Sequence, residues 1–241
     1  MKEKLKSILI KYPSLYRFFQ NYYWKFNEFK AFILGTRLEE KRWAHRSFKE
    51  IEKGFSDLNH PHRKFLVEEI NAFQPESILE IGCGYGPNLF WLAKKIPNAK
   101  IKGIDINSLA IRLGRELFKK EELKNVELLE RKADELSEFR DKEFDVVLTD
   151  ALLICIGPDK IKKVIRELAR ISRKGIIMAE WHTPEGIKEI YDPHIGVWRR
   201  NYKILLSEIF PRKSIFISKI PTELWPDENW QKFGYIIEVI I

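Results

Sequence analysis

The sequence predicts an α/β fold built on a doubly wound, mainly parallel, seven-stranded sheet. From residue 61 onward, short apolar runs alternate with amphipathic helical segments, as in a parallel sheet covered by helices on both faces. A glycine-rich turn joins the first apolar run to the next helix. The last two apolar runs have no room for a long helix between them, so we expect the last strand to be antiparallel.

The composition is typical of a globular chain with one sizeable core. The chain has 241 residues, of which 44% are hydrophobic. Cys83 and Cys155 cannot form a disulfide framework, and no secretory signal precedes them, so we expect reduced thiols and a cytoplasmic location. No apolar run approaches the roughly 20 residues needed to span a bilayer.

Residues 1–56 are predicted to form a helical extension. Its apolar side chains recur mostly at spacings of three and four, which traces one face of a helix that ends at Gly35. They are Tyr12, Leu15, Tyr16, Phe19, Tyr22, Tyr23, Phe26, Phe29 and Ile33. We favour packing of this face against the main domain; a lid over the site and an interfacial membrane helix are alternatives. A second helix is expected from Leu38 to Lys53, with Trp43, Phe48 and Ile51 inward.

The positive charge of the chain is concentrated in this extension. The net charge is +8, and residues 1–56, with thirteen Lys or Arg and six Glu, carry +7 of it. Such an excess can bind nucleic acid, anionic lipid or an acidic substrate. A solvated helical face is the simpler interpretation, and Glu28, Glu39 and Glu40 disfavour membrane attachment because they dilute the basic character.

Residues 57–241 are predicted to form the main domain. Its expected strands cover residues 77–81, 101–105, 126–129, 144–149, 175–179, 214–217 and 235–240. Its expected helices begin at Pro61, after Gly86, at Asn107 or Ser108, and at Pro158.

The turn Glu80-Ile81-Gly82-Cys83-Gly84-Tyr85-Gly86 is the strongest functional signal. Its glycines allow a sharp turn and let a ligand lie against bare backbone, and the next helix offers free N–H groups. Pro87 stands where a dinucleotide fingerprint needs its third glycine, and the Lys-Ser/Thr pair of a phosphate loop is absent. Asp105 ends the second strand, where a carboxylate can accept both hydroxyls of a ribose.

These residues resemble motif I and the acidic second motif of the class I S-adenosylmethionine-dependent methyltransferases. The resemblance continues through Ala133-Asp134 and the run 144–150, and it covers roughly residues 60–241. It implies that S-adenosyl-L-methionine is the cofactor. It also implies that Glu80 orders the turn and that Asp150 lies where donor and acceptor meet.

The resemblance assigns further residues to parts of the cofactor. The methionine part would lie against Gly82, Gly84 and Gly86. The ribose would be held by Asp105, with Ile106 against the adenine and Asp134 accepting from its amino group. The remaining expected contacts are Arg63, near the cofactor carboxylate, and Cys83, Asn88 and Ala133.

Methyl transfer from a sulfonium is an in-line displacement, so alignment and water exclusion supply most of the catalysis. A general base is needed only where the acceptor must lose a proton. The candidates are Asp150, Glu180 and His182, with Tyr191 more distant. His182 is equally well explained as a hydrogen-bonded loop residue. The run 198–202 is predicted to be either a cap over the acceptor or the solvated start of a helix.

Absent motifs narrow the function. The chain has neither the Asn/Asp-Pro-Pro-Tyr signature of base-amine methylation nor the Pro-Cys pair of cytosine C5 methylation, and no His/Cys cluster has zinc spacing. We therefore expect a methyltransferase acting on a small molecule or on a glycan or lipid precursor, with no metal. One alternative is an RNA or protein methyltransferase that uses the basic extension. Another is a non-catalytic cofactor-binding or membrane-surface protein.

Overall fold

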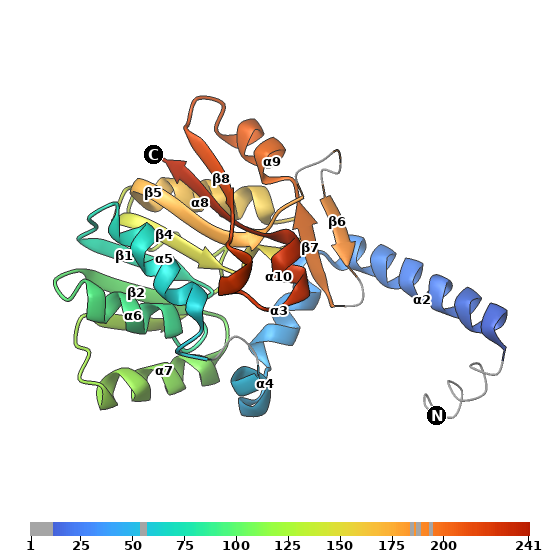
Figure 1. Cartoon of the computed structure of the whole chain (residues 1–241), viewed down its shortest axis with the longest axis horizontal. Helices are drawn as coiled ribbons and strands as arrows, with labels where there is room; N and C mark the ends of the chain where they lie inside the picture. The colour runs from blue at the N-terminus through green and yellow to red at the C-terminus, as the bar shows by residue number, and fades with distance from the viewer. Residues whose placement is uncertain (1–11, 54–56, 184–185, 187–188, 193–194) are drawn as a thin grey trace.

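A computed structural model describes residues 12–53, 57–183, 186, 189–192 and 195–241. A seven-stranded sheet forms its centre, with strand order β3-β2-β1-β4-β5-β9-β8 (Figure 1). The strands are β1 Ser77–Ile81, β2 Lys100–Asp105, β3 Val126–Glu130, β4 Phe144–Asp150, β5 Ser172–Trp181, β8 Ile215–Lys219 and β9 Gly234–Ile240. The first five are parallel, and β9 is antiparallel to both β5 and β8, so the predicted architecture is confirmed.

Helices cover both faces of the sheet, and successive strand residues point to opposite faces. Ile78 and Leu79 of β1 are both buried and belong to two different core clusters. One cluster includes side chains of α5 Pro61–Asn71, α6 Pro87–Lys95 and α7 Ser108–Lys120. The other includes side chains of α8 Ile161–Ile171 and α9 Tyr202–Ile209. The core therefore lies in two layers, one on each side of the sheet.

Helix starts follow local capping chemistry, with one correction. Asn107 caps α7, because its side-chain oxygen accepts from the backbone N–H of Ala110 at 2.9 Å. The helix expected at Pro158 begins only at Ile161. Pro158 lies in a turn in which the N–H groups of Lys160 and Ile161 both donate to the carbonyl of Gly157.

The N-terminal extension forms α2 Pro13–Leu34, α3 Thr36–Ala44 and α4 Phe48–Lys53. Gly35 ends α2 with a φ of 53°, as predicted. The single helix expected over residues 38–53 is wrong, since residues 45–47 interrupt it. The Glu50 carboxylate accepts from both the backbone N–H and the hydroxyl of Ser47, which is one half of an S-x-x-E capping box, and a new helix begins at Phe48.

The apolar face of α2 does not pack against the main domain, which overturns that prediction. Phe18, Tyr22 and Phe29 are 64%, 67% and 63% exposed. Figure 1 shows α2 running outward from the rest of the chain. Within the described ranges, no helix combines the length and the apolar character needed to cross a membrane.

The run 198–202 contains the end of a strand and the start of a helix, and it is mostly buried, so the solvated helix start is wrong. None of its residues is among those that line the cavity described below. A short hairpin of β6 Glu189–Asp192 and β7 Val197–Arg200 precedes α9, and it was not predicted. The side chains of Trp198 and Arg200 are almost fully buried. Asn201 caps α9 by accepting from the backbone N–H of Ile204 at 3.1 Å.

Candidate functional site

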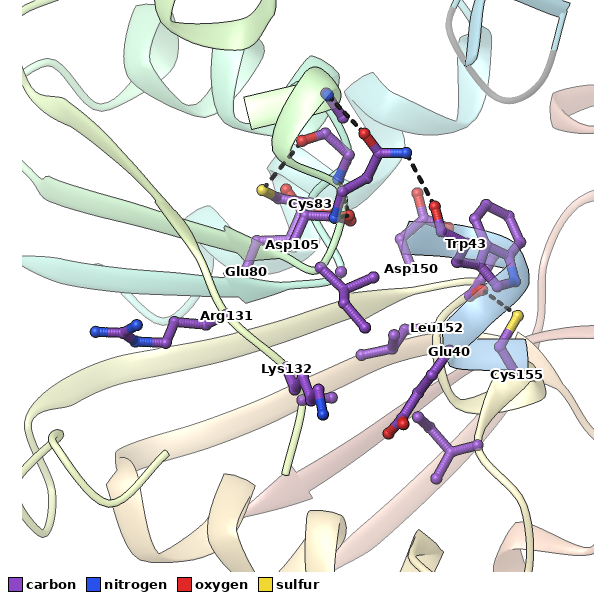
Figure 2. A pocket seen from close by; sticks show the side chains of 18 of the residues that line it. Glu40, Trp43, Glu80, Cys83, Asp105, Arg131, Lys132, Asp150, Leu152 and Cys155 are labelled. Atoms are coloured by element: carbon purple, nitrogen blue, oxygen red, sulfur yellow. Dashed lines mark hydrogen bonds between the residues drawn. The ribbon is translucent and has the colours of Figure 1, made fainter. Parts of the chain in front are cut away.

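A cavity lies at the carboxyl ends of β1, β2 and β4, where ligands bind in open parallel sheets. Its lining combines the glycine-rich turn, the loops that follow β2, β3 and β4, and residues of α3 and α4. Figure 2 shows Glu40 and Trp43 of α3 lining it together with Asp105 and Asp150 of the sheet. The cavity is therefore lined by both the predicted main domain and the N-terminal extension.

The glycine-rich turn forms one wall. Gly82, Gly84 and Gly86 have φ angles of 75°, 56° and 88°, a region that side-chain-bearing residues rarely adopt. A Cβ at Gly82 would lie 2.8 Å from Leu152 Cδ1, whereas a Cβ at Gly84 would meet no atom within 4 Å. Gly84 thus presents bare backbone to the cavity. Cys83 is buried beside it and also lines the cavity.

Asp105 is fixed to this turn. One carboxylate oxygen accepts from the backbone N–H of Gly84 at 2.8 Å, and the other accepts from that of Asn107 at 2.8 Å. Burial raises the pKa of Asp105, although these backbone donors oppose the rise. Each oxygen keeps a further acceptor position, so the carboxylate can still receive two hydroxyls.

The amide of Asn88 organises the charged end of the cavity. Its nitrogen donates to Glu80 Oε1 at 2.7 Å and to Asp150 Oδ2 at 2.9 Å. Its oxygen accepts from Arg63 Nη1 at 2.7 Å. All four residues line the cavity. All four residues were predicted to be at the site from the sequence. The structure adds that the Asn88 amide contacts Arg63, Glu80 and Asp150 at the same time.

Two carboxylate oxygens at this end have no hydrogen-bond partner in the described part of the chain. Glu80 Oε2 and Asp150 Oδ1 are both buried. Burial raises the pKa of Glu80 to about 8. Burial would also raise the pKa of Asp150, but His62, Arg63 and Asn88 hold it below its usual value. Because unpaired buried acceptors are costly, this arrangement favours a ligand that brings donors, above all a cationic group.

His62 supports Asp150 from behind the cavity and was missed as a site residue. Its Nε2 lies 2.9 Å from Asp150 Oδ2, and its Nδ1 lies 2.5 Å from the Nδ1 of His60. The Trp225 ring stacks on the His62 imidazole at 3.9 Å. Local spacing could not reveal this contact, because it joins the start of α5 to the end of β4.

The other expected contacts also line the cavity. Ile106 follows β2, and Ala133 and Asp134 follow β3; all three line the cavity. Lys160 Nζ lies 3.0 Å from Asp134 Oδ2 and 2.5 Å from Glu40 Oε1. The loop after β3 is therefore linked by one cation to α3.

The contribution of α3 and α4 is the main feature that the sequence did not identify by residue. The residues of these helices and of the segment between them that line the cavity are Thr36, Glu39, Glu40, Trp43, Arg46 and Ile51. Asn107 fastens the end of α3, because its side-chain nitrogen donates to the carbonyls of Trp43 at 2.9 Å and Arg46 at 3.2 Å. One asparagine thus caps α7 and holds α3.

Glu180 and His182, two of the candidate bases, are not among the cavity residues. Glu180 is fully buried, and its carboxylate accepts from the Thr149 hydroxyl and from the backbone N–H groups of residues 152–154. His182 Nδ1 accepts from the backbone N–H of Tyr202 at 3.1 Å. Tyr191 packs in a small cluster with Ala31 and Trp198.

Of the candidate bases, Asp150 alone therefore lines the cavity. In the described residues, no group of three or more His, Cys, Asp or Glu side chains is arranged to hold a metal ion.

Comparisons with known proteins agree with this geometry. A family described as "Methyltransferase domain" matches residues 78–175. A demethylmenaquinone methyltransferase of Listeria welshimeri is 27% identical over 208 residues, which cover 82% of this chain and 84% of that protein.

Two solved structures share the fold. One is an S-adenosylmethionine-dependent methyltransferase of Aquifex aeolicus, with a TM-score of 0.59, 17% identity, and coverage of 81% of this chain and 99% of that chain. The other is the 1,6-didemethyltoxoflavin-N1-methyltransferase of Burkholderia thailandensis with bound 1,6-didemethyltoxoflavin and S-adenosylhomocysteine. Its TM-score is 0.62, with 12% identity and coverage of 80% of this chain and 83% of that chain.

Proposed function

We propose that this chain, a member of the class I S-adenosylmethionine-dependent methyltransferases, methylates a small organic molecule or a glycan or lipid precursor. One observation carries the proposal: α3 and α4 line the same cavity as the glycine-rich turn and the strand-end carboxylates. An acceptor bound there would be enclosed by the extension on one side and by the sheet on the other.

We propose that the two parts of the chain have different roles. Residues 57–241 form the cofactor-binding domain, and residues 1–56 form a helical extension whose α3–α4 part acts as a lid. Closure by a lid excludes water from the reacting atoms. The buried, free thiols of Cys83 and Cys155 support a cytoplasmic location.

The cofactor supplies a methyl group on a positively charged sulfur, which an acceptor atom displaces in line. We assign its methionine part to the backbone of Gly82, Cys83, Gly84 and Gly86. Its ammonium group would pair with Glu80 and Asp150, whose buried, unpaired oxygens need donors. Its carboxylate would meet Arg63, and Asn88 would position all three charged side chains.

We assign the nucleoside to the other end of the cavity. Asp105 would accept from the two ribose hydroxyls, since both of its oxygens keep an acceptor position. Ile106 and Ala133 would lie against the adenine. Asp134 would accept from the adenine amino group, with Lys160 holding its carboxylate in place.

The acceptor would lie between the lid and the loop after β4. Apolar side chains from both line the cavity, including Trp43, Leu152 and Ile156, which favours an acceptor with an apolar part. Relatives named for demethylmenaquinone and 1,6-didemethyltoxoflavin agree with a small acceptor. Where the acceptor must lose a proton, Asp150 is the base that we propose, and His62 would hold its carboxylate in position.

Calorimetry and product analysis test this proposal. We expect the purified chain to bind S-adenosylmethionine and to transfer its methyl group to a component of a small-molecule and lipid extract, detected by mass spectrometry. The Gly84→Val variant, whose φ of 56° a β-branched residue cannot easily adopt, should do neither. Transfer to RNA or protein instead, with strongly salt-dependent binding, would favour the polymer-modifying alternative.

A further inference from the structure

The largest group of exposed apolar side chains in the described chain lies on α2 and at its start. We call it the aromatic face; it consists of Tyr12, Leu15, Phe18, Phe19, Tyr22, Tyr23, Phe26, Phe29, Ile33 and Leu34, which are 38% to 67% exposed. Outside α2, the large apolar side chains that are exposed in the described residues are separate in sequence: Ile195, Ile204, Phe216 and Ile240. Single exposed apolar residues are normal, but a contiguous patch marks an interaction surface.

The aromatic face points away from the contact that α2 makes with its own chain. At about 100° per residue, Phe18, Tyr22 and Phe29 fall within about 40° of one another, and Ala31 lies roughly 160° away. Ala31 is buried in a cluster with Tyr191 of β6 and Trp198 of β7. While that contact holds, α2 cannot turn its aromatic face toward the main domain.

The charge of the extension selects among the partners that could cover this face. Helix α2 carries Arg17, Lys25 and Lys30 against Glu28, and residues 1–56 together carry a net charge of +7. A second copy of this helix would bring the same positive charge to the contact. Anionic lipid headgroups would bring the opposite charge, and aromatic rings suit the boundary between headgroups and acyl chains.

We propose that the aromatic face of α2 lies in the headgroup region of an anionic lipid bilayer. Gly35 alone separates α2 from α3, and Thr36 at the start of α3 already lines the cavity. Docking of α2 would therefore place the lid side of the cavity beside the lipid surface. The proposal goes beyond the methyltransferase function, because lipid binding requires no catalysis.

Sedimentation of the full chain with vesicles tests the proposal. We expect binding to vesicles of phosphatidylcholine with about one third phosphatidylglycerol to exceed binding to pure phosphatidylcholine by at least about tenfold, and to weaken as salt is added. The triple variant F18S/Y22S/F29S should lower the binding by at least about tenfold. Phe216→Ser, which removes a 57% exposed ring on β8, is the matched control and should bind like the parent.

Cofactor calorimetry on the same variants separates this proposal from the proposed function. The triple variant should bind S-adenosylmethionine like the parent, because the three rings lie outside the cavity. Equal vesicle binding by the parent and the triple variant would overturn the proposal. So would a dimer, measured by sedimentation equilibrium, that the triple variant loses while no vesicle binding occurs, since the face would then bind a second copy.

Discussion

Helices α2 and α3 follow each other with only Gly35 between them, yet they have opposite surroundings. Helix α2 is the more aromatic, and most of its described side chains are exposed. Helix α3, with the polar sequence TRLEEKRWA, lies against the main domain and lines its cavity. In this extension, specific polar contacts therefore decide which helix packs against the main domain, and the apolar content of the helix does not.

Buried or partly buried hydrogen bonds hold both ends of α3. The Thr36 hydroxyl donates to Asp159 at 2.8 Å and accepts from the backbone N–H of Gly157 at 2.8 Å. At the other end, Asn107 holds two carbonyls of residues 43 and 46. Satisfied buried hydrogen bonds add modest stability, but breaking one leaves an unpaired group that costs about 1–3 kcal/mol. Among the described side chains of α2, Ala31 is the one that is buried, in a small cluster with Tyr191 and Trp198.

The largest effects are expected at the base of the cavity. Asp105→Ala removes the acceptor that fixes the glycine turn and that we assign to the ribose, so the cofactor affinity should fall by about a hundredfold or more. Isothermal calorimetry measures this, with Tyr22→Ser on α2 as the control of unchanged affinity. An Asp105→Ala protein that binds as tightly as the parent would show that the cofactor lies elsewhere.

The next effect is a pH dependence set by Glu80. Because burial raises the pKa of Glu80 to about 8, its carboxyl group is protonated at pH 7 in the protein without cofactor. A cofactor ammonium stabilises the carboxylate, so binding at pH 7 should release a proton and weaken by up to about tenfold per pH unit below 8. Calorimetry in buffers of different ionisation enthalpy counts the proton. Glu80→Gln should abolish the release, and a release that persists in this variant belongs to another group.

Two variants of α3 test how much this part of the proposed lid contributes to cofactor affinity. Trp43→Ala removes an aromatic wall of the cavity, and we expect an increase of about tenfold in the cofactor dissociation constant. Lys41→Ala changes an exposed residue of the same helix and should have no effect. If both variants bind like the parent, α3 contributes nothing to the site beyond its position.

The His182→Ala variant tests whether this residue stabilises the fold or takes part in methyl transfer. His182→Ala leaves the backbone N–H of Tyr202 without its acceptor, so the free energy of unfolding should fall by about 1–3 kcal/mol. Cofactor affinity and turnover of the folded protein should not change, because the imidazole is not part of the cavity lining. Urea denaturation and a transfer assay measure the two quantities. A loss of turnover without a loss of stability would return His182 to the chemistry.

The smallest effect is expected on α2. Tyr22→Ser replaces a side chain that is mostly exposed, so the free energy of unfolding should change by less than about 0.5 kcal/mol. Denaturation with urea checks this. A loss of several kcal/mol would mean that the aromatic face is covered within the protein, and the contrast between α2 and α3 would disappear.

Periodicity and turn chemistry were enough to predict the framework. The strands, the antiparallel last strand and a helix cap at Asn107 or Ser108 follow from patterns within a few residues of each other, and the structure selects Asn107 as the cap. The glycine turn and Asp105 were also predictable as a pair, because the carboxyl ends of neighbouring parallel strands meet at one edge of the sheet.

The errors have a common physical cause. Glu180 lies near the carboxyl end of β5, where a site residue was expected. Its carboxylate instead accepts hydrogen bonds from the backbone N–H groups of residues 152–154. The aromatic spacing of α2 predicted a helix correctly but could not indicate what covers its apolar face. Burial and hydrogen-bond partners depend on residues distant in sequence, which no local pattern contains.

The sequence by itself determined the α/β framework, the helical extension and the turn from Glu80 to Gly86, because backbone preference and hydrophobic periodicity are local properties. Only the tertiary structure decided that His62 supports Asp150, that Asn88 gathers the charged side chains, and that α3 lines the cavity while α2 faces outward. Each of these depends on contacts between residues far apart in the chain, and those contacts exist only once the sheet has brought its strand ends together.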